Sequence, residues 1–103
     1  MLSKRLQLHE ELCEVLGSRN AYFQPPENLN IKYPCIVYSR RPDRIRHAND
    51  DPYIKHEQYD LTVITTDPDS TIADDLVSHF KHCRVDRYFV SDRLNHTTLN
   101  LFY

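Results

Sequence analysis

Histidine and cysteine residues have the spacing of metal ligands in two stretches of the chain. His79, His82 and Cys83 stand at i, i+3 and i+4, and His9 with Cys13 repeats the i, i+4 spacing. On a helix this spacing brings imidazole and thiolate groups onto one face, where they can bind a metal ion. However, Cys83 belongs to an apolar pattern, and no Cys-x-x-Cys pair supplies the other half of a site. We therefore expect exposed histidines, buried cysteines and no metal or other cofactor.

The sequence contains parts of catalytic motifs, but none of these motifs is complete. A metal-dependent nuclease of the Asp…Glu-x-Lys type needs paired carboxylates and a nearby lysine. Asp43 and Glu57 supply the carboxylates here, but Tyr59 occupies the lysine position. No local signature joins a cysteine to a histidine as a nucleophile pair, and the single glycine, Gly17, cannot form a phosphate-binding loop. We predict that the protein is not an enzyme.

The sharpest polar feature is a basic cluster between two predicted strands, formed by Arg40, Arg41, Arg44, Arg46 and His47. Connections between two strands usually have about two to five residues, and longer irregular ones are commonly functional or disordered. Three interpretations are open: a protein interface in which arginine binds carboxylates, a solvated loop partly neutralised by its own aspartates, or contact with nucleic-acid phosphates. We favour the protein interface.

An aromatic pair, Tyr22 and Phe23, precedes Gln24 and two prolines. One interpretation is core packing followed by a rigid turn. The alternative is an exposed aromatic anchor for a neighbouring subunit. Tyr22 and Phe23 are therefore included with the basic cluster as hypothetical interface residues.

The elements that position these residues indicate an α+β fold of the order α-β-β-β-α-β-β, with two helices packed on an antiparallel or mixed sheet. A first helix over 3–16 has Ser3 as its N-cap and Gly17 as its stop. A second begins at 67–71, where Thr71 and Asp74 resemble a capping box, and its apolar pattern continues to Cys83. The predicted strands span 20–24, 35–40, 53–65, 87–91 and 97–103, with a turn over 92–95.

Length and composition limit the classes of function. The 103 residues allow one domain, 1–103. A formal net charge of -2 gives no general attraction to nucleic acid or anionic membranes. No apolar run approaches the roughly 20 residues that span a bilayer, so we expect no membrane partner. Three scattered cysteines fit a reduced intracellular setting with buried thiols.

Several segments resemble small structural proteins of long-tailed bacteriophages, a group that includes tail terminators, tail-completion proteins and head–tail joining proteins. The resemblance covers nearly the whole chain. Its most specific segments are Leu12–Ser18, Tyr22–Pro26, Tyr33–Tyr38, Asp92–His96 and the final Leu101-Phe102-Tyr103. None of them is a catalytic signature.

The resemblance implies a viral structural protein with a tail-terminator-like sandwich fold. Proteins of this type form a homo-oligomeric ring, commonly a hexamer, at the head-proximal end of the tail tube. The implied partners are other copies of the chain, the phage major tail protein and the head–tail connector proteins, and DNA is met only as the genome passes through the tail. The implied location is the virion, at the tail or head–tail junction, after assembly in the host cytoplasm. The alternative is a small phage nucleic-acid-binding protein that uses the loop from Arg40 to His47.

Two subunit contacts are expected for such a ring, because a closed ring needs two different complementary surfaces on each subunit. The basic cluster of one copy could meet an acidic patch of its neighbour formed by Asp67, Asp69, Asp74 and Asp75. The C-terminal strand could also extend the sheet of a neighbour by edge pairing.

Overall fold

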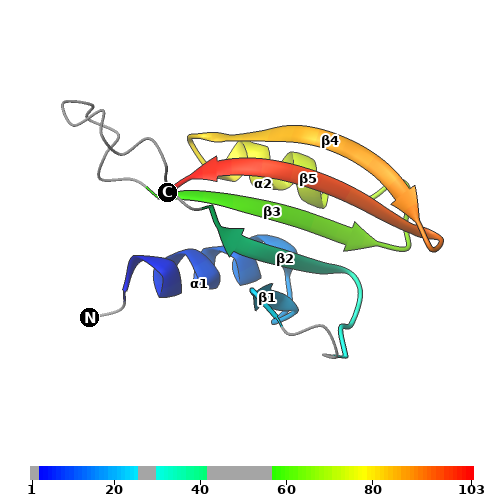
Figure 1. Ribbon diagram of the computed structural model, residues 1–103, viewed down its shortest axis with the longest axis horizontal. Coiled ribbons are helices and arrows are strands. Elements are labelled where there is room, and N and C mark those ends of the chain that lie inside the picture. Colours follow the sequence, from blue (N-terminus) through cyan, green and yellow to red (C-terminus); the bar gives the residue numbers. More distant parts are fainter. Residues whose placement is uncertain (1–2, 26–29, 42–56) are drawn as a thin grey trace.

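The computed structural model describes residues 3–25, 30–41 and 57–103. Its elements are α1 (Lys4–Leu16), β1 (Ala21–Phe23), β2 (Cys35–Arg40), β3 (Gln58–Thr65), α2 (Ile72–His79), β4 (Cys83–Ser91) and β5 (Leu94–Phe102). The strands form one mixed sheet in the order β1-β2-β3-β5-β4, in which β1 and β2 are parallel and the other described pairs antiparallel (Figure 1). The predicted α+β class and element order are confirmed. Neither described helix is long and apolar enough to cross a membrane.

One face of the sheet carries the core. Along β3 every second residue is buried, so Tyr59, Leu61 and Val63 point to the same side, as the alternation of the sequence predicted. The register places Leu99 opposite Leu61 and carries this face onto β5. Both helices pack on this side through residues that are fully buried, namely Leu8, Leu12 and Leu76.

Helix α1 begins and ends as its sequence predicts. The side-chain oxygen of Ser3 accepts a hydrogen bond from the backbone N–H of Leu6 at 3.2 Å, which satisfies one of the free donors of the first turn. Gly17 adopts a left-handed conformation with φ 83°, and its N–H donates to the carbonyl of Cys13 at 2.8 Å. Glycine takes this conformation without the steric penalty of a side chain.

Helix α2 is shorter than predicted. It ends at His79 because Phe80 takes an extended conformation and enters the core, where it is 7% exposed. Cys83 therefore lies in β4, and the predicted helical face shared by His79, His82 and Cys83 is wrong. The capping box is also wrong, because the Thr71 side chain makes no capping bond and its hydroxyl instead donates to Asp75 at 3.3 Å.

The C-terminal hairpin is longer than expected and its turn is tighter. Asp92 and Arg93 alone connect β4 to β5, both with left-handed φ values of 52° and 65°, as two-residue hairpins of type I′ require. The strand β5 lies between β3 and β4. The expectation that the C-terminal strand extends a neighbour's sheet is therefore wrong, since both of its sides are already paired. The open edges of the described sheet belong to β1 and β4.

Candidate interaction surfaces at one end of the sheet

The predicted interface residues are divided between the two faces of the sheet. Phe23 and Arg40 lie on the helix-covered face, with the Arg40 guanidinium carbon 5.9 Å from the centre of the Phe23 ring. Arg41 donates two hydrogen bonds, of 2.8 and 3.2 Å, to Asp60 on the opposite face. Tyr22 also belongs to that opposite face by register. Arg44, Arg46 and His47 lie outside the described residues.

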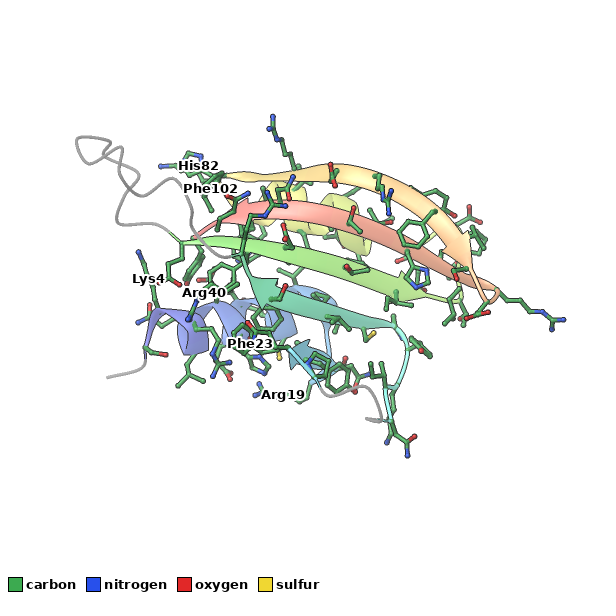
Figure 2. The ribbon with its side chains drawn as sticks, viewed as in Figure 1. Lys4, Arg19, Phe23, Arg40, His82 and Phe102 are labelled. Atoms are coloured by element: carbon green, nitrogen blue, oxygen red, sulfur yellow. The ribbon has the colours of Figure 1, made fainter. Side chains whose placement is uncertain are left out.

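Phe23 of β1 and Arg40 at the end of β2 (labelled in Figure 2) belong to an arginine–aromatic cluster. It consists of Arg5, Phe23, Tyr38, Arg40 and Tyr59. The Arg5 guanidinium carbon lies 4.6 Å from the centre of the Phe23 ring, and that of Arg40 lies 5.8 Å from the centre of the Tyr59 ring. Each such contact contributes about 0.5–1 kcal/mol at an exposed site. Phe23 is half-buried and packs against the core, including Tyr38 at 5.1 Å between ring centres.

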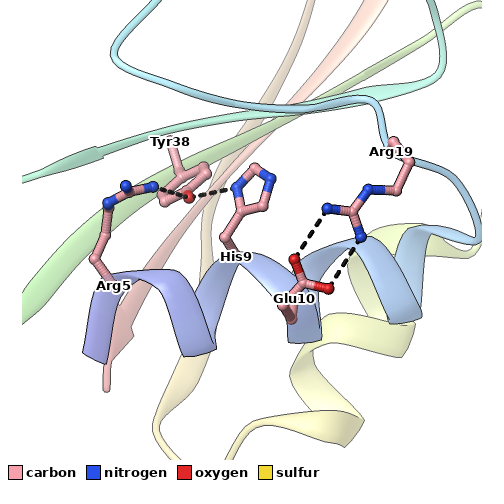
Figure 3. A network of polar contacts seen from close by, with 5 residues as sticks. All are labelled: Arg5, His9, Glu10, Arg19 and Tyr38. Atoms are coloured by element: carbon pink, nitrogen blue, oxygen red, sulfur yellow. Dashed lines mark hydrogen bonds and ion pairs between the residues drawn. The ribbon is translucent and has the colours of Figure 1, made fainter. Parts of the chain in front are cut away.

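The Tyr38 hydroxyl connects this cluster to α1 (Figure 3). It lies 2.7 Å from Nδ1 of His9 and accepts a hydrogen bond from Arg5 at 3.4 Å. Burial lowers the pKa of His9, and the charges of Arg19 and Arg5 lower it further. A neutral imidazole is thereby favoured, and its Nδ1 shares a hydrogen bond with the Tyr38 hydroxyl. These hydrogen bonds join β2 to α1.

The carboxylate of Glu57 is held within the same cluster. Arg40 Nε lies 2.6 Å from Glu57 Oε2, and the Tyr59 hydroxyl donates to the same oxygen at 3.3 Å. The side chains of Arg40 and Glu57 are 47% and 39% exposed, so solvent screens the pair strongly. Glu57 of the incomplete nuclease pattern thus forms a partly exposed ion pair with Arg40. The other carboxylate of that pattern, Asp43, lies outside the described residues.

A second polar cluster joins three elements that are distant in sequence. Glu11 of α1 accepts a hydrogen bond from the hydroxyl of Tyr103 just after β5, and its other oxygen lies 2.9 Å from Nε2 of His79 at the end of α2. A cavity of about 520 Å³ opens beside this cluster. We call it the end cavity. Its described lining residues are Lys4, Gln7, Glu11, His79, Phe80, Lys81, His82, Phe102 and Tyr103.

No sequence pattern predicts the end cavity. Glu11 and Tyr103 are separated by 92 positions and Glu11 and His79 by 68, and each of these residues fits an ordinary amphipathic pattern. The sequence did show basic residues around the end of α2. Their position depends on where the chain leaves α2. The apolar pattern predicted a helix that continues to Cys83, whereas α2 ends at His79.

The three cysteines are buried and unpaired, as expected. Burial raises the pKa of the Cys35 and Cys83 thiols to about 11 and also raises that of Cys13. A protonated, enclosed thiol is a poor nucleophile and a poor metal ligand at neutral pH. Within ranges 3–25, 30–41 and 57–103, no group of three or more His, Cys, Asp or Glu side chains is placed to hold a metal ion.

Tyr103 should ionise late in an alkaline titration. Burial raises its pKa to about 12, assisted by the hydrogen bond to Glu11 and by the charge of that carboxylate. Because the folded pKa lies above the unfolded value of about 10, the stability linked to this proton is complete below pH about 10 and is lost as the pH rises through about 12. In an absorbance titration of phenolate, Tyr103→Phe should remove a tyrosine that ionises near pH 12. Loss of a tyrosine that ionises near pH about 10 would contradict the assignment.

Comparison of the chain with protein-family models, curated proteins and solved structures found no match. The geometry of the described residues defines a small α+β domain with a mixed five-stranded sheet.

Proposed function

We propose that the protein is a non-enzymatic structural component of a long-tailed phage virion, a tail terminator or head–tail joining subunit that forms a ring at the head-proximal end of the tail tube. The resemblance of Leu12–Ser18, Tyr33–Tyr38 and Asp92–His96 to such proteins supplies the biological setting. The observation that carries the proposal is the edge strand β4, which exposes large apolar side chains.

The edge strand β4 exposes three large apolar side chains among charged ones. Val85, Tyr88 and Val90 are 46%, 55% and 60% exposed, although valine and tyrosine are common in paired strands. An edge strand also offers unpaired backbone groups, which readily pair with another chain. A β-bulge between Val85 and Arg87 interrupts the strand, and the regular part from Arg87 to Ser91 remains. Such a surface supports a role in protein assembly.

The basic residues nearest the sheet favour this role over nucleic-acid binding. Arg40 and Arg41 each contact a carboxylate of their own chain, Glu57 and Asp60. A phosphate would have to compete with these partners. The loop residues Arg44 and Arg46 remain candidates for an interface by sequence alone.

The proposal is tested by self-assembly of the purified protein. We expect light scattering after size exclusion, at increasing protein concentration, to detect oligomers, and negative-stain electron microscopy to show closed rings. Rings arise because each subunit repeats one heterologous contact around an axis. A protein that stays monomeric throughout, and instead shifts duplex DNA with an affinity that falls steeply with salt, would favour the nucleic-acid alternative.

A further inference from the structure

The described lining of the end cavity includes both basic and aromatic residues. Lys4, His79, Lys81 and His82 bring basic groups to its lining, and Phe80, Phe102 and Tyr103 supply aromatic surface. Lys4 of α1, His82 just before β4 and Phe102 at the end of β5 all lie at the same end of the molecule (Figure 2). Phe102 is 41% exposed. The cavity therefore suits a ligand that is both acidic and partly apolar.

Glu11, the acidic residue in the described lining, is paired with His79, so the lysines Lys4 and Lys81 supply the remaining formal charge of that lining. The Glu11 carboxylate is directed to the Tyr103 hydroxyl and to His79. Its negative charge is used to hold α1, α2 and the end of β5 together. Lys81 is exposed at the rim, where a lysine ammonium acts as a mobile point charge for an anionic partner.

The opposite end of α2 carries the complementary charge. Asp67, Asp69, Asp74 and Asp75 are all exposed there. Asp67 accepts a hydrogen bond from the backbone of Asp69 at 2.9 Å, and Asp75 accepts one from Thr71 at 3.3 Å. Among the described residues, none of the four aspartates forms an ion pair with a cationic side chain. Pro68, exposed among them, adds apolar surface.

We propose that the end cavity binds the acidic segment 67–75 of a second copy of this chain. The aspartates would meet the lysines of the lining, Lys4 and Lys81, and Pro68 would add an apolar contact. Because the two surfaces lie at opposite ends of α2, the contact is head-to-tail and repeats from copy to copy. The inference rests on the proposed ring function and names its subunit contact.

The acidic surface in this contact is the one predicted from the sequence, but the basic surface is a different one. The sequence placed the basic cluster from Arg40 to His47 against Asp67, Asp69, Asp74 and Asp75. In the structure, Arg40 and Arg41 are engaged within the chain. The end cavity offers basic groups together with a concave surface of about 520 Å³.

Zero-length cross-linking of the wild-type protein tests the contact directly. A carbodiimide joins lysine amines to carboxylates that touch, and mixing isotopically labelled with unlabelled copies identifies links between copies. We expect mass spectrometry to find Lys4 or Lys81 of one copy joined to an aspartate of segment 67–75 of another. If oligomers form but their links join other surfaces, the contact is wrong and the ring function stands. If no oligomer forms, the ring function itself fails.

Charge reversal provides the second test. Lys81→Glu and Asp74→Lys should each weaken self-association by at least about tenfold in analytical ultracentrifugation, because like charges then face each other across the contact. An equimolar mixture of the two variants should recover association, since every contact between unlike copies has opposite charges. Lys32→Glu and Glu14→Lys make the same changes of charge at other exposed positions and should associate like the wild type. Wild-type association of Lys81→Glu and Asp74→Lys would overturn the proposal.

Discussion

Replacing Leu76 by alanine is expected to lower the free energy of unfolding by about 2–5 kcal/mol, the usual cost of deleting a fully buried leucine side chain. Leu76 has no exposed surface and is the buried residue of α2. A helix of eight residues is too short to be stable alone, so α2 depends on this anchor to the sheet. Urea unfolding followed by circular dichroism measures the loss.

Val77→Ala is the matched control, because Val77 is the next residue of the same helix and is 38% exposed. It should change the free energy of unfolding by no more than about 1 kcal/mol. If both variants lose the same amount, Leu76 does not anchor the helix as described. Leu76→Ala should also weaken self-association, because α2 connects the acidic segment to the end cavity.

The predicted elements were most accurate where local chemistry determines them. Ser3 and Gly17 fix the ends of α1 through bonds made within a single turn. The alternation of Tyr59, Leu61 and Val63 predicted the buried face of β3, because successive side chains of a strand point to opposite faces. These signals need no knowledge of distant parts of the chain.

The end of α2 was missed because one pattern fits two structures. Leu76, Phe80 and Cys83 continue an apolar helical stripe, yet Phe80 and Cys83 are equally buried when the chain leaves the helix and begins β4. The side chains alone do not distinguish these paths. The choice depends on pairing of β4 with β5, which is a tertiary effect that overrides local preference.

The sequence shows the basic cluster as a group, but it does not show which carboxylates pair with Arg40 and Arg41. Arg40 meets Glu57 and Arg41 meets Asp60 because β2 and β3 are antiparallel neighbours in a particular register. A one-residue shift of that register would send the two arginines to the opposite faces. The sequence therefore shows where the arginines are, whereas the pairing of β2 with β3 determines which carboxylates Arg40 and Arg41 contact.

Glu11→Ala is expected to lower the free energy of unfolding by about 1–2 kcal/mol, the range for a hydrogen bond to a charged group reduced by partial exposure. The side chain of Glu11 is 37% exposed, and it connects α1 to both His79 and Tyr103. Its removal leaves the half-buried Tyr103 hydroxyl without this acceptor. Chemical unfolding at neutral pH measures the effect.

Glu14→Ala separates this role from a general effect of charge and helix propensity. Glu14 lies one turn further along α1 and is exposed, so its replacement should be nearly neutral. Combining Glu11→Ala with Tyr103→Phe should cost less than the sum of the single changes, because both remove the same hydrogen bond. Additive losses would mean that the two side chains do not act together. In that case the hydrogen bond between Glu11 and Tyr103 does not hold the end of β5 against α1.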